Sequence, residues 1–118
     1  MHTRELTRTL AWSTGEKKVA RAAFDAALER ERTSVRREVE SMLARSSDSA
    51  EIWSVRDYLN DKAREIDAKY DYRYSVLIDV LGRLVAERWL SIPELGGLAP
   101  EKLQLIEQHS TYWQKRDA

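Results

Sequence analysis

The chain has 118 residues, and its 20 basic and 20 acidic side chains give a formal net charge of zero, which argues against a nucleic-acid-binding protein. It contains no cysteine, which excludes a disulfide framework, a thiolate metal site and a cysteine nucleophile. Gly and Pro are few, and none lies between Glu16 and Leu81, so the composition predicts an all-α protein.

Membrane insertion and secretion are also disfavoured. No apolar stretch approaches the ~20 residues that a membrane-spanning helix needs, and the longest candidate, residues 74–86, contains Asp79 and Arg83. Residues 1–10 lack the apolar core of a signal peptide. We therefore expect a cytoplasmic protein with no membrane partner.

The first predicted elements are a flexible arm over residues 1–13 and a long helix from residue 14 to about Ala44. Ser13 and Glu16 have the spacing of a capping box, which marks the start of the helix. The apolar stripe of this helix skips one position at residues 31–32, so we expect the middle of the helix to be hydrated. The stripe consists of Phe24, Leu28, Val35, Val39 and Met42.

A second helix follows a break at residues 45–49, with Asp48 as the expected N-cap and Glu51 three residues later. Its apolar positions are spaced 3, 4, 4, 3 and 4 residues apart, close to the 3.5-residue repeat of a helix-packing seam. The two helices are expected to form a long hairpin over residues 14–70. The seam consists of Ile52, Val55, Leu59, Ala63, Ile66 and Tyr70.

The remaining residues, 71–118, predict a small helical head, so that the whole chain, 1–118, forms a single domain. A third helix from Ser75 to Trp89 is apolar on most sides, which is typical of a buried helix. Ser91 is placed to cap a short turn, and Pro100 suits the first turn of a fourth helix. That helix carries Leu103, Ile106, His109 and Trp113 on one stripe.

The length of the first helix predicts an elongated shape. About 30 residues at 1.5 Å per residue extend over ~45 Å, whereas a compact domain of this size has a radius of gyration of only ~13.5 Å. The hairpin must therefore project beyond the head, and a hairpin alone buries little apolar area. A second copy packed along it would cover that area, so we expect a homodimer.

Few side chains are placed for catalysis or metal binding. His109 lies on an apolar stripe, where a hydrogen-bonded structural histidine is the more common case, and Gly96-Gly97 lacks the lysine of a phosphate-binding loop. The acidic residues around Glu65 lie among Lys62, Arg64, Lys69 and Arg73 and indicate surface ion pairs. We expect no enzyme, no cofactor and no metal. A DNA-binding helix-turn-helix is disfavoured because the fourth helix has few basic residues.

One face of the second helix carries residue types that a merely solvent-exposed helix face does not need. Trp53, Asp57, Asn60 and Arg64 follow one another at spacings of 4, 3 and 4 residues, with Arg56 adjoining them and Ile52 beside them on the seam. Tryptophan and arginine are enriched at the centres of protein–protein interfaces, so these six residues form the candidate site for dimerisation and partner binding. The equally weighted alternative is that Trp53 covers the end of the hairpin.

The most specific motif of the chain lies in the same region. Residues 52–59 read Ile-Trp-Ser-Val-Arg-Asp-Tyr-Leu, and residues 62–76 read Lys-Ala-Arg-Glu-Ile-Asp-Ala-Lys-Tyr-Asp-Tyr-Arg-Tyr-Ser-Val. This run resembles the fluorescence recovery protein family of cyanobacteria, and the similarity extends from about Trp12 to Ile106. The resemblance implies an all-helical homodimer without cofactor or enzymatic step. It further implies that Trp53 and Asp57 lie at or beside the dimer interface, with Ile52 packed within it.

The family resemblance also implies a partner. Proteins of this family bind the light-activated orange carotenoid protein, speed its return to the resting form and end phycobilisome quenching. The chain departs from the family pattern at four positions: Arg56 replaces a His, Ala63 an Arg, Asp79 a Phe and Leu105 a basic residue. A different protein partner, such as a related carotenoid-binding domain in an organism without phycobilisomes, is therefore an open alternative, as is an unrelated helical scaffold or regulator.

Overall fold

The computed structural model describes residues 10–117, and within that range it contains four α-helices, one short 3₁₀-helix and no strand. The predicted all-α class is confirmed. The first nine residues of the predicted arm, including His2, lie outside the described part. The elements are α2 (Thr14–Arg45), α3 (Glu51–Lys69), α4 (Leu77–Ala86), η1 (Ile92–Leu95) and α5 (Pro100–Asp117).

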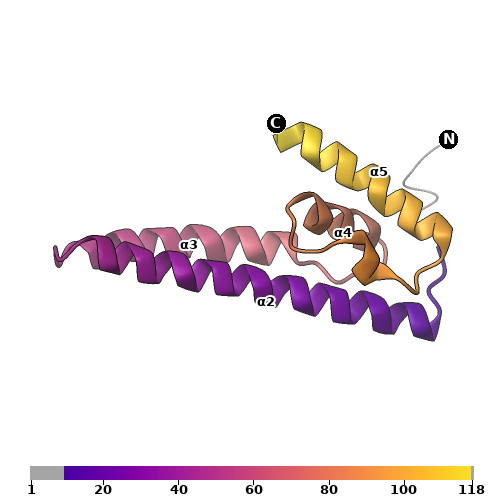
Figure 1. The fold of residues 1–118 in the computed structure, drawn as a ribbon, viewed down its shortest axis with the longest axis horizontal. Helices are drawn as coiled ribbons and strands as arrows, with labels where there is room; N and C mark the ends of the chain where they lie inside the picture. Colours follow the sequence, from indigo (N-terminus) through magenta and orange to yellow (C-terminus); the bar gives the residue numbers. More distant parts are fainter. Residues whose placement is uncertain (1–9, 118) are drawn as a thin grey trace.

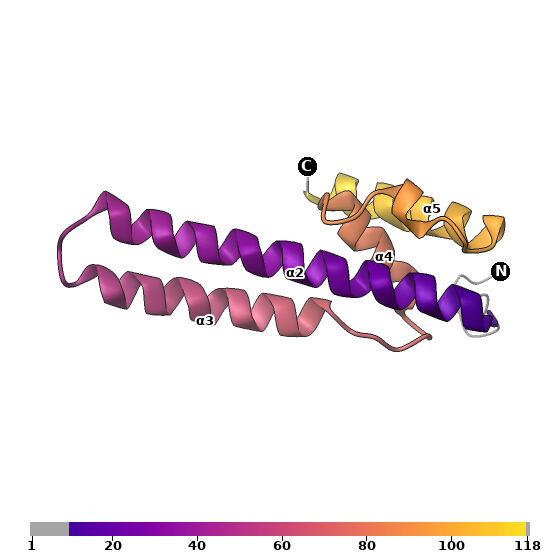
Figure 2. The same ribbon diagram turned by 60° about the horizontal axis from the view of Figure 1, so that its bottom comes forward.

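The helices α2 and α3 form a long antiparallel hairpin, and α4, η1 and α5 pack at one end of it (Figures 1 and 2). The described chain measures 55 × 28 × 21 Å with a radius of gyration of 17.0 Å, well above the ~13.5 Å expected of a compact domain of this length. The predicted projection of the hairpin beyond the head is therefore confirmed.

The helix ends follow local capping chemistry, with two differences from the sequence expectation. The Ser13–Glu16 capping box is present, with the Glu16 N–H donating to Ser13 Oγ over 3.1 Å. Asp48 was predicted as the N-cap of α3, and this prediction is wrong. Ala50 holds the N-cap position, and the Asp48 carboxylate accepts the Ala50 N–H. The helix α4 is shorter than predicted because Arg88 adopts a left-handed φ of 69° just beyond its end.

The core lies inside the head, around α4. This helix buries Leu77, Ile78, Leu81 and Leu84, as its all-round apolar character predicted. Gly82 allows α5 to approach closely, since a Cβ at that position would lie 2.6 Å from His109 Cβ. From α2, the core receives only residues of its first half, namely Ala20, Ala23, Phe24 and Ala27.

The middle of α2 is not hydrated, which corrects the sequence expectation. Glu31 is only 5% exposed and Lys69, expected on the surface, is 7% exposed. Lys69 Nζ lies 2.7 Å from Glu31 Oε1 and 2.6 Å from Glu87 Oε1, and Arg83 Nε donates to Glu87 Oε2 over 2.9 Å. These buried charges connect α2, α3 and the end of α4.

The tyrosine that follows α3 completes this network. The Tyr70 hydroxyl donates to Glu31 Oε1 over 2.8 Å, and burial, followed by that hydrogen bond, raises the pKa of Tyr70 well above its ordinary value. Burial alone would raise the pKa of Glu87, but the hydrogen bonds from Lys69 and Arg83 lower it overall. The network therefore keeps Tyr70 neutral and Glu87 ionised at neutral pH.

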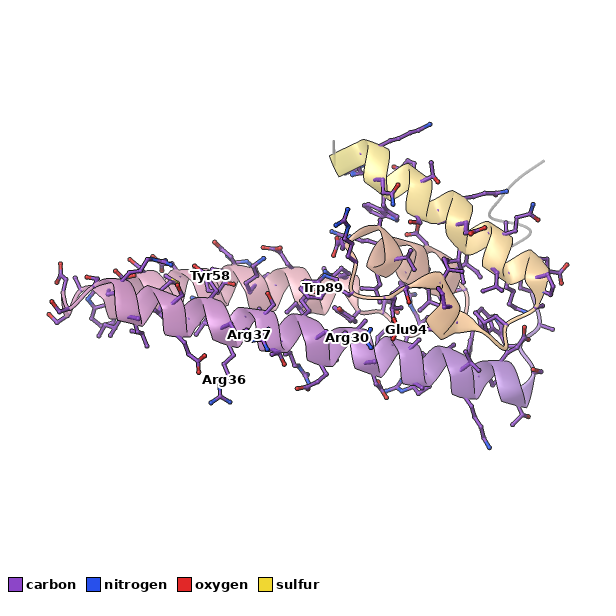
Figure 3. All side chains as sticks on the ribbon, viewed as in Figure 1. Arg30, Arg36, Arg37, Tyr58, Trp89 and Glu94 are labelled. Carbon is purple, nitrogen blue, oxygen red and sulfur yellow. The ribbon has the colours of Figure 1, made fainter. Side chains whose placement is uncertain are left out.

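A second ion pair fastens the head to α2. Arg30 Nη2 lies 2.6 Å from Glu94 Oε2 on η1, and Arg30 Nη1 also donates to the backbone carbonyl of Trp89 (Figure 3). This guanidinium, together with the Ser91 N–H, lowers the pKa of Glu94 to about 2. The carboxylate is thus ionised throughout the neutral range.

Acidification is expected to destabilise the protein through Glu16. Its carboxylate accepts the N–H groups of Ser13 and Ala99 and a charged hydrogen bond from Lys102, which lower its pKa from 4.5 to about 2. A carboxylate whose pKa is lowered by folding stabilises the protein fully above its unfolded pKa and loses that contribution as the pH falls. The melting temperature should therefore drop as the pH is lowered from about 4.5 to about 2.

The variant Glu16→Gln isolates this contribution. It should lower the melting temperature at neutral pH and show a smaller further loss on acidification than the parent, because the group that titrates has been removed. Melting curves followed by circular dichroism at several pH values provide the measurement. Equal acid sensitivity in the two proteins would assign the effect to other carboxylates.

Candidate functional site

The six residues of the candidate site all lie on α3 and are all exposed. The apolar members are largely uncovered, with 52% of Ile52 and 56% of Trp53 accessible. Such exposure is unusual for large apolar residues that lie side by side. Trp53 therefore leaves more than half of its surface open to solvent within a single chain. The set consists of Ile52, Trp53, Arg56, Asp57, Asn60 and Arg64.

Three of these side chains form one contiguous unit. The Arg56 guanidinium lies 5.3 Å from the centre of the Trp53 ring, within the range of a cation–π contact. The same guanidinium pairs with Asp57, with Nη2 and Nε 2.9 Å and 3.1 Å from Oδ1. An exposed ion pair adds little to stability, so this arrangement is better suited to presenting an aromatic ring and a carboxylate to a partner.

The other members lie near this unit without contacting it through a side-chain hydrogen bond. Arg64 pairs with Asp61, with Nη2 2.6 Å from Oδ1, and the Asn60 side chain forms no hydrogen bond within the described part of the chain. The spacing on α3 still places Asn60 and Arg64 on the same helix face as Trp53 and Asp57. The structure therefore keeps the predicted face but joins only part of it by direct contacts.

An apolar stripe adjoins this surface on the distal half of the hairpin. Leu43, near the end of α2, is 49% exposed, and Leu59, about two turns along α3 from the uncovered Ile52, is 41% exposed. In the described residues, no hydrophobic side chain between Ala27 and Leu77 is fully buried. Sequence reasoning missed Leu43 because it lies one position off the regular stripe that ends at Met42. Its apolar character beside an otherwise regular stripe was the only available signal.

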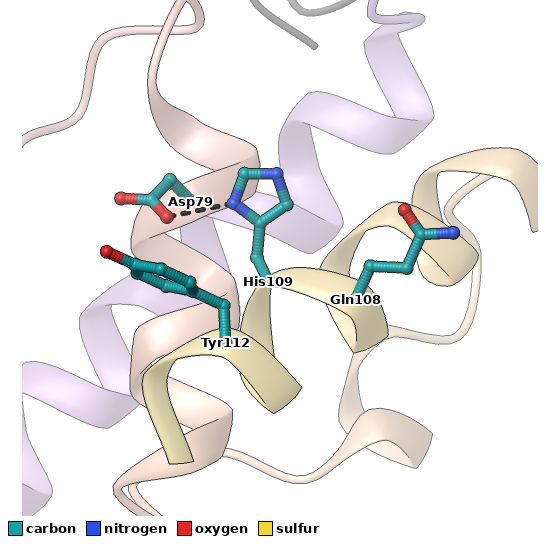
Figure 4. Close-up of a pocket in the computed structure, with 4 residues that line it drawn as sticks. All are labelled: Asp79, Gln108, His109 and Tyr112. Atoms are coloured by element: carbon teal, nitrogen blue, oxygen red, sulfur yellow. Dashed lines mark hydrogen bonds and ion pairs between the residues drawn. The ribbon is translucent and has the colours of Figure 1, made fainter. Parts of the chain in front are cut away.

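A second polar cluster lies in the head, between α4 and α5. Asp79 Oδ1 accepts from Trp113 Nε1 over 2.9 Å and lies 2.8 Å from His109 Nδ1. The contact with His109, opposed by burial and assisted by Trp113, lowers the pKa of Asp79. Figure 4 shows Asp79, His109, Gln108 and Tyr112 around a cavity of about 330 Å³. His109 is thus hydrogen-bonded within the fold, as predicted for a structural histidine.

The described residues offer few other chemical features. They contain no group of three or more His, Asp or Glu side chains arranged to hold a metal ion. None of their helices combines the length and the apolar character needed to cross a membrane. The α3 surface, with its exposed aromatic ring flanked by a guanidinium and a carboxylate, is the feature best suited to binding another protein.

Comparison with known proteins relates this fold and surface to one family. The family model described as "Photoprotection regulator fluorescence recovery protein" matches residues 12–110. The fluorescence recovery protein of Synechocystis is 34% identical over 101 residues, which cover 86% of this chain and 93% of that protein.

Solved structures show the same similarity in three dimensions. The fluorescence recovery protein of Fremyella diplosiphon superposes with a TM-score of 0.79 and 40% identity, and that of Synechocystis with 0.80 and 33%. Each match covers 86% of this chain and 99% of the solved chain.

Proposed function

This chain belongs to the fluorescence recovery protein family of photoprotection regulators, and on that premise we propose that it accelerates the return of photoactivated orange carotenoid protein to its resting form. Through that step it would end phycobilisome quenching in the cytoplasm. The observation that carries the proposal is the exposed surface on α3 around Trp53, Arg56 and Asp57, within the segment that matches the family.

The acting species in this proposal is a homodimer built along the hairpin. The uncovered stripe of Leu43, Ile52 and Leu59 supports it, since the distal hairpin lacks fully buried apolar side chains in the described residues. A second copy packed on the stripe would remove these side chains from water. The Trp53 surface would then lie at the edge of the dimer interface, where a partner can reach this surface and the adjoining interface together.

The mechanism requires binding energy and no bond chemistry. A regulator that binds the transition-like arrangement of its client more tightly than the photoactivated form lowers the barrier to relaxation. Each tenfold acceleration needs about 1.4 kcal/mol of such preference. A few buried contacts from Trp53 and its flanking charges can supply that amount. We accordingly propose a non-enzymatic protein without cofactor.

A specific observation favours a second candidate partner. Where the family carries a Phe in the head, this chain has Asp79, whose carboxylate is occupied by His109 and Trp113. Arg56, Ala63 and Leu105 also replace family residues of a different character. The alternative proposal is that the same α3 surface serves another protein partner, such as a related carotenoid-binding domain in an organism that lacks phycobilisomes.

Mixing the protein with photoactivated orange carotenoid protein tests the first proposal. In the dark, the red form should decay to the orange form several-fold faster with excess protein than without it, as followed by absorbance. The variant Trp53→Ala should lose most of this acceleration, because it removes the exposed ring. As a control, Lys18→Ala removes an exposed side chain at the other end of the hairpin and should act like the parent.

The departures from the family distinguish the two candidates. If the parent leaves the decay unchanged while the double variant Arg56→His, Asp79→Phe accelerates it, the chain has the family fold with altered partner contacts, and the alternative is supported. If neither protein changes the decay, the orange carotenoid protein is excluded as the partner of this surface.

A further inference from the structure

A cavity of about 470 Å³, lined mostly by charged and hydroxyl-bearing residues, lies between α2 and the segment that follows α4, apart from the α3 surface. One face of α2 and two residues beyond α4 form its walls, and Figure 3 labels Arg30, Arg37 and Trp89 among them. The lining residues are Glu29, Arg30, Thr33, Ser34, Arg37, Arg88 and Trp89. Three arginines and two hydroxyl-bearing residues therefore line one opening.

The three guanidinium groups are not equivalent. Arg30 is occupied by Glu94, with two hydrogen bonds of 2.6 Å and 3.0 Å, and by the carbonyl of Trp89. Within the described part of the chain, neither Arg37 nor Arg88 forms an ion pair. The cavity thus contains two positive charges without a carboxylate partner, beside a third that has one.

The backbone at Arg88 provides an independent observation. Its φ of 69° lies in the left-handed region, where glycine is the favoured residue after a helix end. Here an arginine with a long charged side chain occupies the position and lines the cavity. Strained backbone that presents a polar side chain is concentrated at binding sites, and glycine would close the helix at lower cost.

We propose that this cavity binds a phosphate-type oxyanion between Arg37 and Arg88. Guanidinium groups match the geometry of phosphate oxygens and stay charged at every physiological pH. The neighbouring Arg30–Glu94 pair shows that one guanidinium suffices for one carboxylate. The Thr33 hydroxyl donates to Glu29. The two further guanidiniums and the Ser34 hydroxyl still offer more donors than one carboxylate can accept, whereas a doubly charged tetrahedral anion can use them.

The one carboxylate that lines the cavity allows an opposite effect on anion affinity to be predicted. Glu29 lines the wall, and its Oε2 lies 3.5 Å from Thr33 Oγ1. A negative charge at this position opposes anion binding, so it sets an upper limit on affinity in the parent protein. Neutralising it should strengthen the site, whereas removing either free arginine should weaken it. The two opposite effects cannot both arise from general changes in stability.

Calorimetric titration of the full chain at neutral pH and constant ionic strength tests the site. Inorganic phosphate should bind saturably, and glycerol phosphate shows whether the cavity also admits a phosphate carried on a larger group. Arg37→Gln and Arg88→Gly should each weaken phosphate binding by about tenfold, and Glu29→Gln should strengthen it. Acetate, at the same ionic strength, should bind far more weakly than phosphate.

Two controls separate the site from nonspecific charge. Arg36→Gln removes the neighbouring arginine, which points away from the head in Figure 3 and pairs with Glu40, and should leave phosphate binding unchanged. Arg88→Gly relieves the left-handed backbone, so its melting temperature should equal or exceed that of the parent while it loses the anion. Absent binding in the parent, equal loss in Arg36→Gln, or equal affinity for acetate would each overturn the proposal.

Discussion

A Lys69→Met chain is expected to be about 3 kcal/mol less stable to unfolding than the parent, because the substitution leaves a buried carboxylate without its cation. Lys69 is the shared partner of Glu31, at 2.7 Å, and Glu87, at 2.6 Å. Methionine matches the length of the lysine stem, so packing is largely preserved. Denaturant titration with comparison of m-values measures the loss.

A neighbouring lysine provides the matched control. Lys62 lines one cavity together with Glu31, Lys69 and Glu87, but its ion pair is with exposed Glu65, at 3.6 Å, so Lys62→Met should cost less than about 1 kcal/mol. The double variant Glu31→Gln, Lys69→Met should recover much of the loss, because both charges are then removed. If Lys69→Met matched the Lys62→Met control in stability, the network would contribute no more than a surface pair.

The sequence predicts helix ends where capping chemistry is local. Ser13 with Glu16, and Ser91 with Glu94, form capping boxes in the structure at the predicted positions. Asp48 fails as a cap because its carboxylate accepts from the Ala50 N–H before the helix begins. A residue that can cap a helix can also close a turn, and the path of the chain between the two helices decides which occurs.

The buried ion network could not be predicted from periodicity. A pattern analysis assigns charged residues to solvent. Glu31 falls where the apolar stripe of its helix skips a position, and Lys69 lies outside the stripe of its own helix. They are buried only because α4 ends beside the hairpin and brings Glu87 to Lys69. Burial of a charge depends on partners from other elements, and those partners are 18 and 38 residues from Lys69 in the chain.

The candidate site on α3 and the cavity at Arg37 and Arg88 also differ in whether their residues are close in sequence or brought together by packing. Trp53, Arg56 and Asp57 share one helix, so their spacing alone places them together, and their contacts are present in the structure. The basic cavity combines α2 with a segment more than 50 residues away in sequence. No spacing rule joins Arg37 to Arg88, and only the packing of the head against α2 brings them to one cavity.

The second large effect is expected at the uncovered stripe, where Ile52→Glu should convert a dimer into a monomer. At micromolar concentration, light scattering of the parent should give twice the 13.7 kDa mass of one chain, as the proposed homodimer requires. A charge buried in the seam without a partner costs about 3 kcal/mol or more, which weakens association at least about 100-fold. In a two-fold symmetric interface the substitution occurs on both copies, which adds to the penalty.

Ser54→Glu provides the matched control for this result. It adds the same charge to the same helix two residues later, about 200° around the axis from Ile52, at an exposed position. This variant should remain dimeric, and both variants should keep the helical content of the parent, because the head core lies elsewhere. A monomeric parent would refute the homodimer directly. An interface along the Leu43, Ile52 and Leu59 stripe requires that only Ile52→Glu separate the two chains. If both variants dissociated equally, the added net charge would be the cause and an interface along this stripe would be refuted.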